Sequence, residues 1–312
     1  MDYIGIDIGG TKCAVVKGNV DTGVREKIGF PTTTPDGTIR EIFSAVRKLM
    51  PAEAIGISCG GPLDEKKGVI MSPPNLPGWD NVPITAMLEA EFGIKAYLCN
   101  DANACALAEW RFGAGKGTEN MVFLTFGTGL GAGLILNGKL YTGAGGNAGE
   151  VGHIRLAKSG PVGYGKEGSF EGFCSGGGIK NLAEILARRA FSSGKYLSYA
   201  KTEADLDALN TKRLAELAKS GDRDALKVFE ISAKKLGQGL SVIIDVLNPE
   251  AIVIGSVYAR CEELFEKKML KIMEKEALCE SLALCKVLPA ELGDEVGDVA
   301  ALCVAIEASK RI

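Results

Sequence analysis

The sequence predicts an α/β protein of two domains. Apolar strand-like runs alternate with amphipathic helical segments, one strand–turn–strand pattern occurs twice, and 312 residues suffice for two cores. The repeated pattern covers residues 3–18 ("YIGIDIGGTKCAVVKG") and 121–136 ("MVFLTFGTGLGAGLIL"). We therefore expect a domain boundary near residue 115.

The first predicted domain covers residues 1–115. After the first strand pair, we expect a strand over 24–30 and a helix over 36–50 that is capped by Asp36 or Thr38. "AIGISCGGP" predicts a strand ending in two glycines, and "GWDNVPITAMLEAEFG" contains a short helix. "IKAYLCNDANACALAEWRFG" predicts a strand, a break at "ND" and a further helix.

The second predicted domain covers residues 116–295. It opens with the repeated strand pair and has helical periodicity from 177 to about 276, interrupted only by the buried strands "EAIVIGS" and "ALCKVLP". A last helix, about 296–312, is expected to pack back on the first domain.

Composition excludes several classes of protein. The 36 basic and 39 acidic residues are well mixed, so we expect no nucleic-acid partner. No apolar run is long enough to span a membrane, and the N-terminus is too short and acidic for a signal peptide. The nine cysteines form no CxxC pair, which predicts small buried side chains in a reducing cytoplasm.

The first glycine turn, "DIGGTK", permits two interpretations. Gly9 and Gly10 allow backbone N–H groups to face a phosphate, Asp7 can reach a Mg²⁺ ion, and the side chains of Thr11 and Lys12 can donate hydrogen bonds to phosphate oxygens. The alternative is a plain hairpin. The motif is neither a Walker A loop nor a dinucleotide fingerprint, because no helix follows the glycines.

The second turn, "FGTGLGAG", offers the same chemistry without charges. Gly127, Thr128 and Gly129 can present a hydroxyl and several amides to an anion. Two such hairpins would hold a polyphosphate from opposite sides of a cleft, unless they are two unrelated tight turns. Gly255 and Ser256 in "IVIGS" suit the rim of an adenosine pocket, although every α/β strand ends in some turn.

Polar side chains near glycine-rich segments suggest sugar binding. Asp101, where a strand meets a helix, is either an N-cap, or a general base that takes a proton from an attacking hydroxyl, or both. Glu150, Glu171 and His153, the only histidine, can bind sugar hydroxyls; solvated glutamates and a buried histidine are the alternatives. Asn75 lies in "SPPNLPGW", which by itself is an ordinary proline-rich connection.

Together these motifs resemble the ROK family of repressors, open reading frames and sugar kinases, in the actin/hexokinase/Hsp70 ATPase superfamily. "DIGGTK", "PNLPGW", "NDANACALAE", "FGTGLGAG", "GAGGNAGEVGH", "EGFCSG" and "LGDEVGD" occur in the family's order over nearly the whole chain. The resemblance implies two ribonuclease H-like (actin-like ATPase) domains, with a cleft that closes over ATP–Mg²⁺ and a hexose.

The resemblance also implies roles for individual residues. Asp101 is then the catalytic base, and the sugar contacts are Asn75, Asn100, Glu150, His153 and Glu171. The nucleotide side comprises Asp7, Gly9, Gly10, Thr11, Lys12, Gly127, Thr128, Gly129 and Gly255.

One family feature is altered in this chain. Many ROK proteins join the histidine to three cysteines in CxCGxxGCxE, where this chain has Val162, Tyr164 and Ser169. Because these side chains are absent from zinc sites or rare in them, we expect no structural zinc. His153 would then keep only a hydrogen bond to the sugar.

We therefore expect an ATP-dependent kinase for the 6-hydroxyl of glucose or a close aldohexose, and, from the resemblance, a homodimer. Mannose, fructose and N-acetylhexosamines are alternative substrates. A ROK repressor would need an N-terminal helix-turn-helix, for which a hairpin beginning at residue 3 leaves no room. A catalytically silent sugar-binding protein is the third alternative, opposed by the intact Asp101 and both glycine turns.

Overall fold

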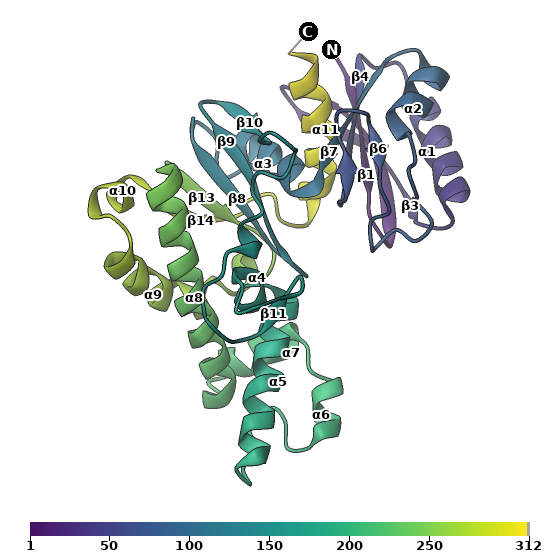
Figure 1. Cartoon of the computed structure of the whole chain (residues 1–312). Helices are drawn as coiled ribbons and strands as arrows, with labels where there is room; N and C mark the ends of the chain where they lie inside the picture. Colours follow the sequence, from purple (N-terminus) through teal and green to yellow (C-terminus); the bar gives the residue numbers. More distant parts are fainter. Residues whose placement is uncertain (311–312) are drawn as a thin grey trace. The chain divides into compact units, whose positions relative to one another are not determined.

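The computed structural model describes residues 1–310 and confirms the α/β class. The chain divides into two compact units, drawn in Figure 1. Unit 1 comprises Met1–Gly117, Gly133–Ala148 and the segment from Glu291 onward, and unit 2 comprises Thr118–Ala132 and Gly149–Ala290. Within the described residues, no helix combines the length and the apolar character that crossing a bilayer requires.

The first sheet has the strand order β3-β2-β1-β4-β7. Its strands are β1 (Tyr3–Ile8), β2 (Lys12–Asn19), β3 (Gly23–Pro31), β4 (Ala54–Cys59) and β7 (Lys95–Asn100). Strand β2 runs antiparallel to both of its neighbours, whereas β4 is parallel to β1 and to β7. A separate small hairpin pairs β5 (Leu63–Asp64) with β6 (Val69–Ile70).

Helices cover both faces of this sheet, as Figure 1 shows. They are α1 (Pro35–Leu49) and α2 (Ile84–Phe92) on one face and α11 (Val296–Ser309) on the other, with α3 (Asp101–Phe112) following β7. The predicted caps of α1 were wrong: the helix begins one residue before Asp36, and the Thr34 side chain accepts a hydrogen bond from Gly37 N at 3.3 Å. Proline at the first helical position has no N–H to leave unsatisfied, which favours this start.

Helix α11 lies directly on the backbone of β1 and β4. A Cβ atom placed on Gly5 would lie 2.5 Å from Leu302 N, and one on Gly56 would lie 2.3 Å from Ala305 N. Both glycines are therefore required by the close approach of the helix. Of the helix predicted over 296–312, the last two residues lie outside the described residues.

The second sheet repeats the order of the first, which confirms the predicted internal repeat. Its order is β10-β9-β8-β13-β14, and β13 is parallel to β8 and to β14. The strands are β8 (Met121–Phe126), β9 (Leu130–Leu136), β10 (Lys139–Tyr141), β13 (Ala251–Ile254) and β14 (Lys286–Pro289).

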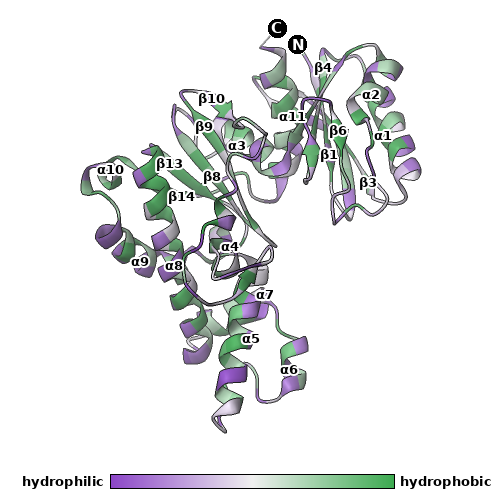
Figure 2. Ribbon diagram, viewed as in Figure 1, coloured by the Kyte–Doolittle hydropathy of each residue, from purple (hydrophilic) through white to green (hydrophobic). Residues whose placement is uncertain are grey.

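The predicted helical region from residue 177 onward is confirmed. The helices of unit 2 are α4 (Phe170–Phe173), α5 (Gly176–Ser192), α6 (Glu203–Asp207), α7 (Thr211–Lys219), α8 (Arg223–Leu247), α9 (Val257–Glu276) and α10 (Cys279–Leu284). Two 3₁₀ turns, η1 (Val151–His153) and η2 (Gly293–Glu295), and a hairpin of β11 (Val162–Gly163) with β12 (Lys166–Glu167) complete the chain. Figure 2 shows that the strands of both sheets are mainly apolar, whereas α9 is largely hydrophilic.

Substituting Gly56 tests the seating of α11. Gly56→Ala should lower the free energy of unfolding by about 2 kcal/mol or more, because the added methyl group overlaps backbone atoms of the helix. Gly29→Ala is the matched control, since its Cβ would meet its nearest atom, Cys13 O, only at 3.9 Å. Urea unfolding of both variants measures the difference; equal stabilities would contradict this account.

Candidate functional site

Parallel pairing brings three chain segments to one edge of the first sheet. Ile8 pairs with Cys59, and Cys59 pairs with Asn100, so β1, β4 and β7 end side by side. The carboxyl ends of parallel strands are where α/β proteins place their binding sites. Asp7 therefore lies at the same edge as Asp101.

Two glycines leave space at this edge for three polar side chains. A Cβ on Gly60 would lie 3.7 Å from the side-chain amide of Asn75 and 3.7 Å from the Asp101 carboxylate. A Cβ on Gly61 would lie 3.6 Å from Asn100 Nδ2. The predicted residues Asn75, Asn100 and Asp101 thus gather around one glycine pair, to which the sequence analysis gave no role.

The proline-rich loop that carries Asn75 is anchored in the core of unit 1. Leu76 and Trp79 are buried in the core of unit 1, whereas Asn75 between the prolines is exposed. A Cβ on Gly10 would lie 2.5 Å from Asn75 O, so the first glycine turn and this loop are in backbone contact. Gly10 is needed for this approach, whatever else the turn binds.

The junction of β7 and α3 corrects one interpretation of Asp101. Asn100, and not Asp101, is the N-cap, because its side chain accepts a hydrogen bond from Ala102 N at 3.0 Å. Asp101 is the first helical residue, and its Oδ1 accepts from the same N–H group at 2.8 Å. Its carboxylate keeps solvent access but has protein on several sides; the loss of hydration raises its pKa, and the backbone hydrogen bond opposes this shift in part.

A hollow of about 200 Å³ beside Asp7 concentrates charge. Its charged lining comprises Asp7, Lys12, Lys27, Asp294 and Asp298. The pKa of Asp7 is raised to about 6, mainly by burial and then by the negative charges of Asp298 and Asp101, against the opposing effect of Lys12 and Lys27. Ionising this carboxylate alone is costly, and a neighbouring cation lowers that cost. The carboxylate oxygens of Asp7 and Asp298 could therefore hold a Mg²⁺ ion.

The ion pair of Lys27 with Asp298 at this hollow was not predicted from the sequence. Asp298 was visible in the motif "LGDEVGD", but a single lysine in a strand, such as Lys27, carries no local signal. Glu65, whose Oε1 accepts a hydrogen bond from Asn100 N at 2.7 Å, was not predicted either.

In unit 2, Glu171 of α4 is tied to the second glycine turn. Leu130 N donates a hydrogen bond to Glu171 Oε2 at 3.0 Å, and a Cβ on Gly129 would lie 2.7 Å from the same oxygen. Glu150 and His153 lie at the two ends of η1, with His153 N donating to Glu150 O at 3.2 Å. Both of those side chains are exposed, and η1 contacts α4.

The start of α5 meets the other predicted residues of this turn. Gly176 N donates to Gly127 O at 2.7 Å, and Gly177 N donates to Thr128 O at 3.2 Å. Ser256, next to the buried Gly255, has a φ of 52° and places its Oγ 3.7 Å from the Cβ position of Gly127. Ser256 was expected with Gly255 at this strand end, but its positive φ could not be predicted, because it depends on the strand end to which the residue is attached.

The three residues that stand where many ROK proteins have cysteines differ in their surroundings. Val162 and Tyr164 are exposed on the β11–β12 hairpin, and the buried Ser169 is the N-cap of α4, accepting from Gly172 N at 3.1 Å. Among residues 1–310, no three His, Cys, Asp or Glu side chains are grouped as metal ligands would be. The absence of structural zinc stays a prediction.

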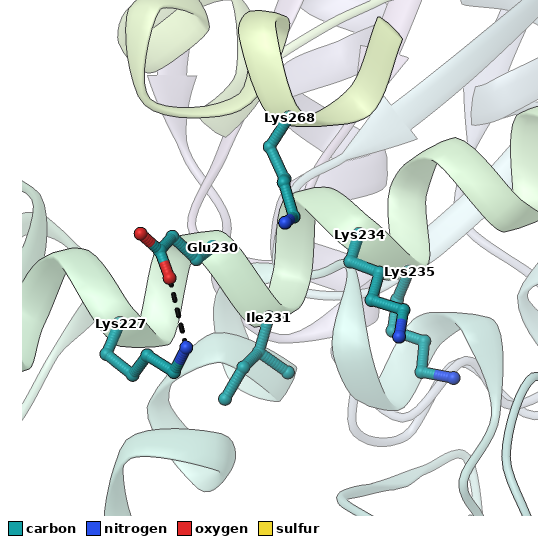
Figure 3. A pocket seen from close by; sticks show the side chains of 6 residues that line it. All are labelled: Lys227, Glu230, Ile231, Lys234, Lys235 and Lys268. Atoms are coloured by element: carbon teal, nitrogen blue, oxygen red, sulfur yellow. Dashed lines mark hydrogen bonds and ion pairs between the residues drawn. The ribbon is translucent and has the colours of Figure 1, made fainter. Parts of the chain in front are cut away.

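A larger hollow, of about 380 Å³, lies at α8 and α9 (Figure 3), and none of the predicted site residues lines it. It is lined by Lys227, Glu230, Ile231, Lys234, Lys235 and Lys268, and Lys227 is ion-paired with Glu230. Glu230 neutralises only one of the four lysines. Lysine-lined surfaces of this kind are ordinary solvated faces, and we assign this one no part in a reaction.

The predicted site residues thus form two groups, one in each unit. Unit 1 holds Asp7, Gly9, Gly10, Thr11, Lys12, Asn75, Asn100 and Asp101. Unit 2 holds Gly127, Thr128, Gly129, Glu150, His153, Glu171 and Gly255. That the two glycine turns hold one polyphosphate between them stays a prediction.

Comparison with known proteins identifies relatives over the whole chain. The sequence model of the ROK family matches residues 3–308. A glucokinase of Thermotoga maritima is 32% identical over 271 residues, which cover 85% of this chain and 84% of that protein. Two solved structures are similar throughout.

The first of these structures is a ROK hexokinase from Thermus thermophilus, with 28% identity, a TM-score of 0.84 and 100% of both chains covered. The second is a ROK family glucokinase from Streptomyces griseus in complex with glucose and AMPPNP, with 30% identity, a TM-score of 0.77, and 98% and 100% of the two chains covered. The chain therefore has the two-domain actin-like ATPase fold of these proteins.

Replacing Asp7 should change the pH dependence of stability. With its pKa raised to about 6, folded Asp7 holds a proton between about pH 4 and 6 that the unfolded chain has lost, so its contribution to stability falls as the pH rises through that window. Asp7→Asn should therefore stabilise the protein by about 2 kcal/mol at pH 8 and by almost nothing near pH 4.

Urea unfolding in Mg²⁺-free buffer at the two pH values measures this effect. Asp21→Asn, at an exposed turn position, is the control and should change the stability equally at both. A stabilisation by Asp7→Asn that did not depend on pH would contradict the raised pKa.

Proposed function

We propose that this chain, which belongs to the ROK family, is an ATP-dependent sugar kinase that phosphorylates the 6-hydroxyl of glucose or a close aldohexose. Kinase activity is supported by the match over residues 3–308 and by full-length similarity to glucokinases, one of which was solved with glucose and an ATP analogue. We propose glucose as the substrate because glucokinases are among the similar proteins.

Asp101 is the proposed general base, and the surroundings of its carboxylate support this role. Its carboxylate lies beside Asn75 at Gly60, at the carboxyl edge of the sheet, with a pKa raised by loss of hydration. A raised pKa makes the ionised carboxylate a better proton acceptor. Asp101 would accept the proton of the sugar hydroxyl as its oxygen attacks the γ-phosphate.

The nucleotide phosphates are proposed to lie along the first glycine turn. Gly10 and Thr11 would offer backbone N–H groups, and the exposed Lys12 a positive charge. Gly9 would line the turn without donating, because its N–H donates to Lys12 O at 3.2 Å. Asp7, with Asp298 nearby, would hold the Mg²⁺ ion directly or through water. When bound, Mg²⁺ neutralises phosphate charge. Gly127, Thr128, Gly129 and Gly255 of unit 2 are proposed for the same nucleotide.

For the hexose, we propose the contacts that the family resemblance implies. Asn75 and Asn100 would contact it near Asp101, and Glu150, His153 and Glu171 would bind hydroxyls from unit 2. The carboxylate of Glu171 is oriented by its hydrogen bond from Leu130 N, which leaves its second oxygen available to accept from a hydroxyl.

We also propose a cytoplasmic location and a homodimer. All nine cysteines are free thiols, six of them buried, which suits a reducing compartment. The dimer follows from the family resemblance alone, and sedimentation velocity would measure it.

A panel of hexoses tests the substrate. Glucose, mannose, fructose, N-acetylglucosamine and N-acetylmannosamine are each incubated with ATP–Mg²⁺, and coupled ADP release and product mass are recorded. We expect the highest kcat/KM with glucose and a product phosphorylated at the 6-hydroxyl. A preference for fructose or an N-acetylhexosamine would overturn the substrate, and sugar binding without ADP release would overturn catalysis.

Asp101→Asn tests the base. The substitution should leave the fold and the Kd for hexose nearly unchanged and lower kcat by about 10²- to 10⁴-fold, because the proton acceptor is lost. Steady-state kinetics and calorimetric titration with the sugar measure the two quantities. Asp21→Asn, at an exposed turn, should keep full activity. A kcat within a few-fold of the wild type would remove Asp101 from this role.

A further inference from the structure

Tyr164 occupies a turn position that ordinarily excludes a residue of its kind. Strands β11 and β12 pair Gly163 with Lys166, so Tyr164 and Gly165 form a two-residue hairpin turn. Their φ values are 44° and 74°. Positive φ at both positions defines a type I′ turn, in which Asn, Asp or Gly is strongly preferred at the first position. A tyrosine here works against local backbone preference.

Burial does not explain the tyrosine. Tyr164 is 81% exposed, so its ring contributes little to the apolar core. The ring instead lies edge-to-face against the imidazole of His153, with centroids 5.4 Å apart and planes at 76°. Unfavourable backbone conformations persist where the surrounding structure enforces them, and they cluster at functional sites.

The hairpin that carries the ring is fixed to the segments on either side. Lys166 Nζ donates a hydrogen bond to His153 O at 2.6 Å. A Cβ on Gly163 would lie 2.5 Å from Gly172 N, so the hairpin packs closely against α4. Ser169 Oγ joins them further, donating to Gly163 O at 3.4 Å. The hairpin that carries the Tyr164 ring is thus fixed by several contacts, beside the exposed His153.

We propose that Tyr164 is a positioning residue that orients the His153 imidazole for the hexose. The edge-to-face contact restricts rotation of an exposed side chain that would otherwise sample several rotamers. Holding the imidazole in one orientation before the sugar arrives reduces the ordering cost of binding. This inference rests on the proposed function, because it takes His153 to contact the hexose.

Two substitutions at this position separate the ring from the turn. Tyr164→Asn removes the ring and installs a residue that suits the type I′ turn, whereas Tyr164→Phe keeps the ring and removes only the hydroxyl. Tyr164→Asn should raise the KM and Kd for hexose about three- to ten-fold, as loss of an aromatic contact would. The change in kcat should stay below about two-fold, and thermal stability should not fall. Tyr164→Phe should resemble the wild type.

The single histidine provides a readout that does not depend on activity. Because His153 is the only histidine, the imidazole C–H signals in a proton–carbon NMR spectrum of tag-free protein come from one side chain. The Tyr164 ring current should displace these signals in the wild type and in Tyr164→Phe. In Tyr164→Asn they should move toward the positions of a free imidazole. In a His153→Asn background, Tyr164→Asn should raise KM no further.

Several outcomes would overturn the inference. They are an unchanged imidazole signal or KM in Tyr164→Asn, equal impairment of Tyr164→Phe, and a loss of thermal stability that accompanies the rise in KM. Failure of the proposed function is a separate result: the wild-type protein would then phosphorylate no hexose in the panel. The NMR comparison would still decide whether the tyrosine ring orients His153.

Discussion

Parallel pairing of β1, β4 and β7 is the constraint on which the proposed chemistry depends. It aligns three strand ends, so that Asp7, Gly60 and Asp101 share one edge although they are distant in the sequence. The pairing in turn needs α11, whose backbone lies against Gly5 and Gly56. A side chain at either glycine would lift the helix from the sheet. The position of the proposed base is therefore connected to the last helix of the chain.

The fold by itself does not stabilise the negative charges at this edge of the sheet, and the proposed function gives a reason for them. Burial and the negative charges of Asp298 and Asp101 raise the pKa of Asp7, and Lys12 and Lys27 offset this only in part. Loss of hydration raises the pKa of Asp101. A fold selected for stability alone would replace such a group of carboxylates. A bound cation and its phosphates would supply the missing counter-charges, which gives the cluster a physical reason. Tyr164 in unit 2 is a parallel case, with unfavourable backbone beside a proposed sugar contact.

Local features of the site were visible in the sequence, and contacts between distant segments were not. The glycine turns, the break at Asn100–Asp101 and the short helix ended by Gly93 depend on neighbouring residues, and the structure confirms them. The caps could not be chosen from the sequence, because adjacent polar residues compete for the same backbone N–H groups. Thr34 caps α1 in place of Asp36 or Thr38, and Asn100 caps α3 in place of Asp101. The pairing of Lys27 with Asp298 joins residues 271 positions apart.

By itself, the sequence determined the α/β class, the repeated strand pair, the family and the residue types of the candidate site. These follow from periodicity, turn chemistry and motif order, which are all written along the chain. Only the tertiary structure decided that Asn75 and Asp101 meet at Gly60, that Glu171 accepts a hydrogen bond from the second glycine turn, and that Tyr164 contacts His153. Such contacts depend on how strands pair and how closely backbones approach, and no short stretch of sequence encodes either.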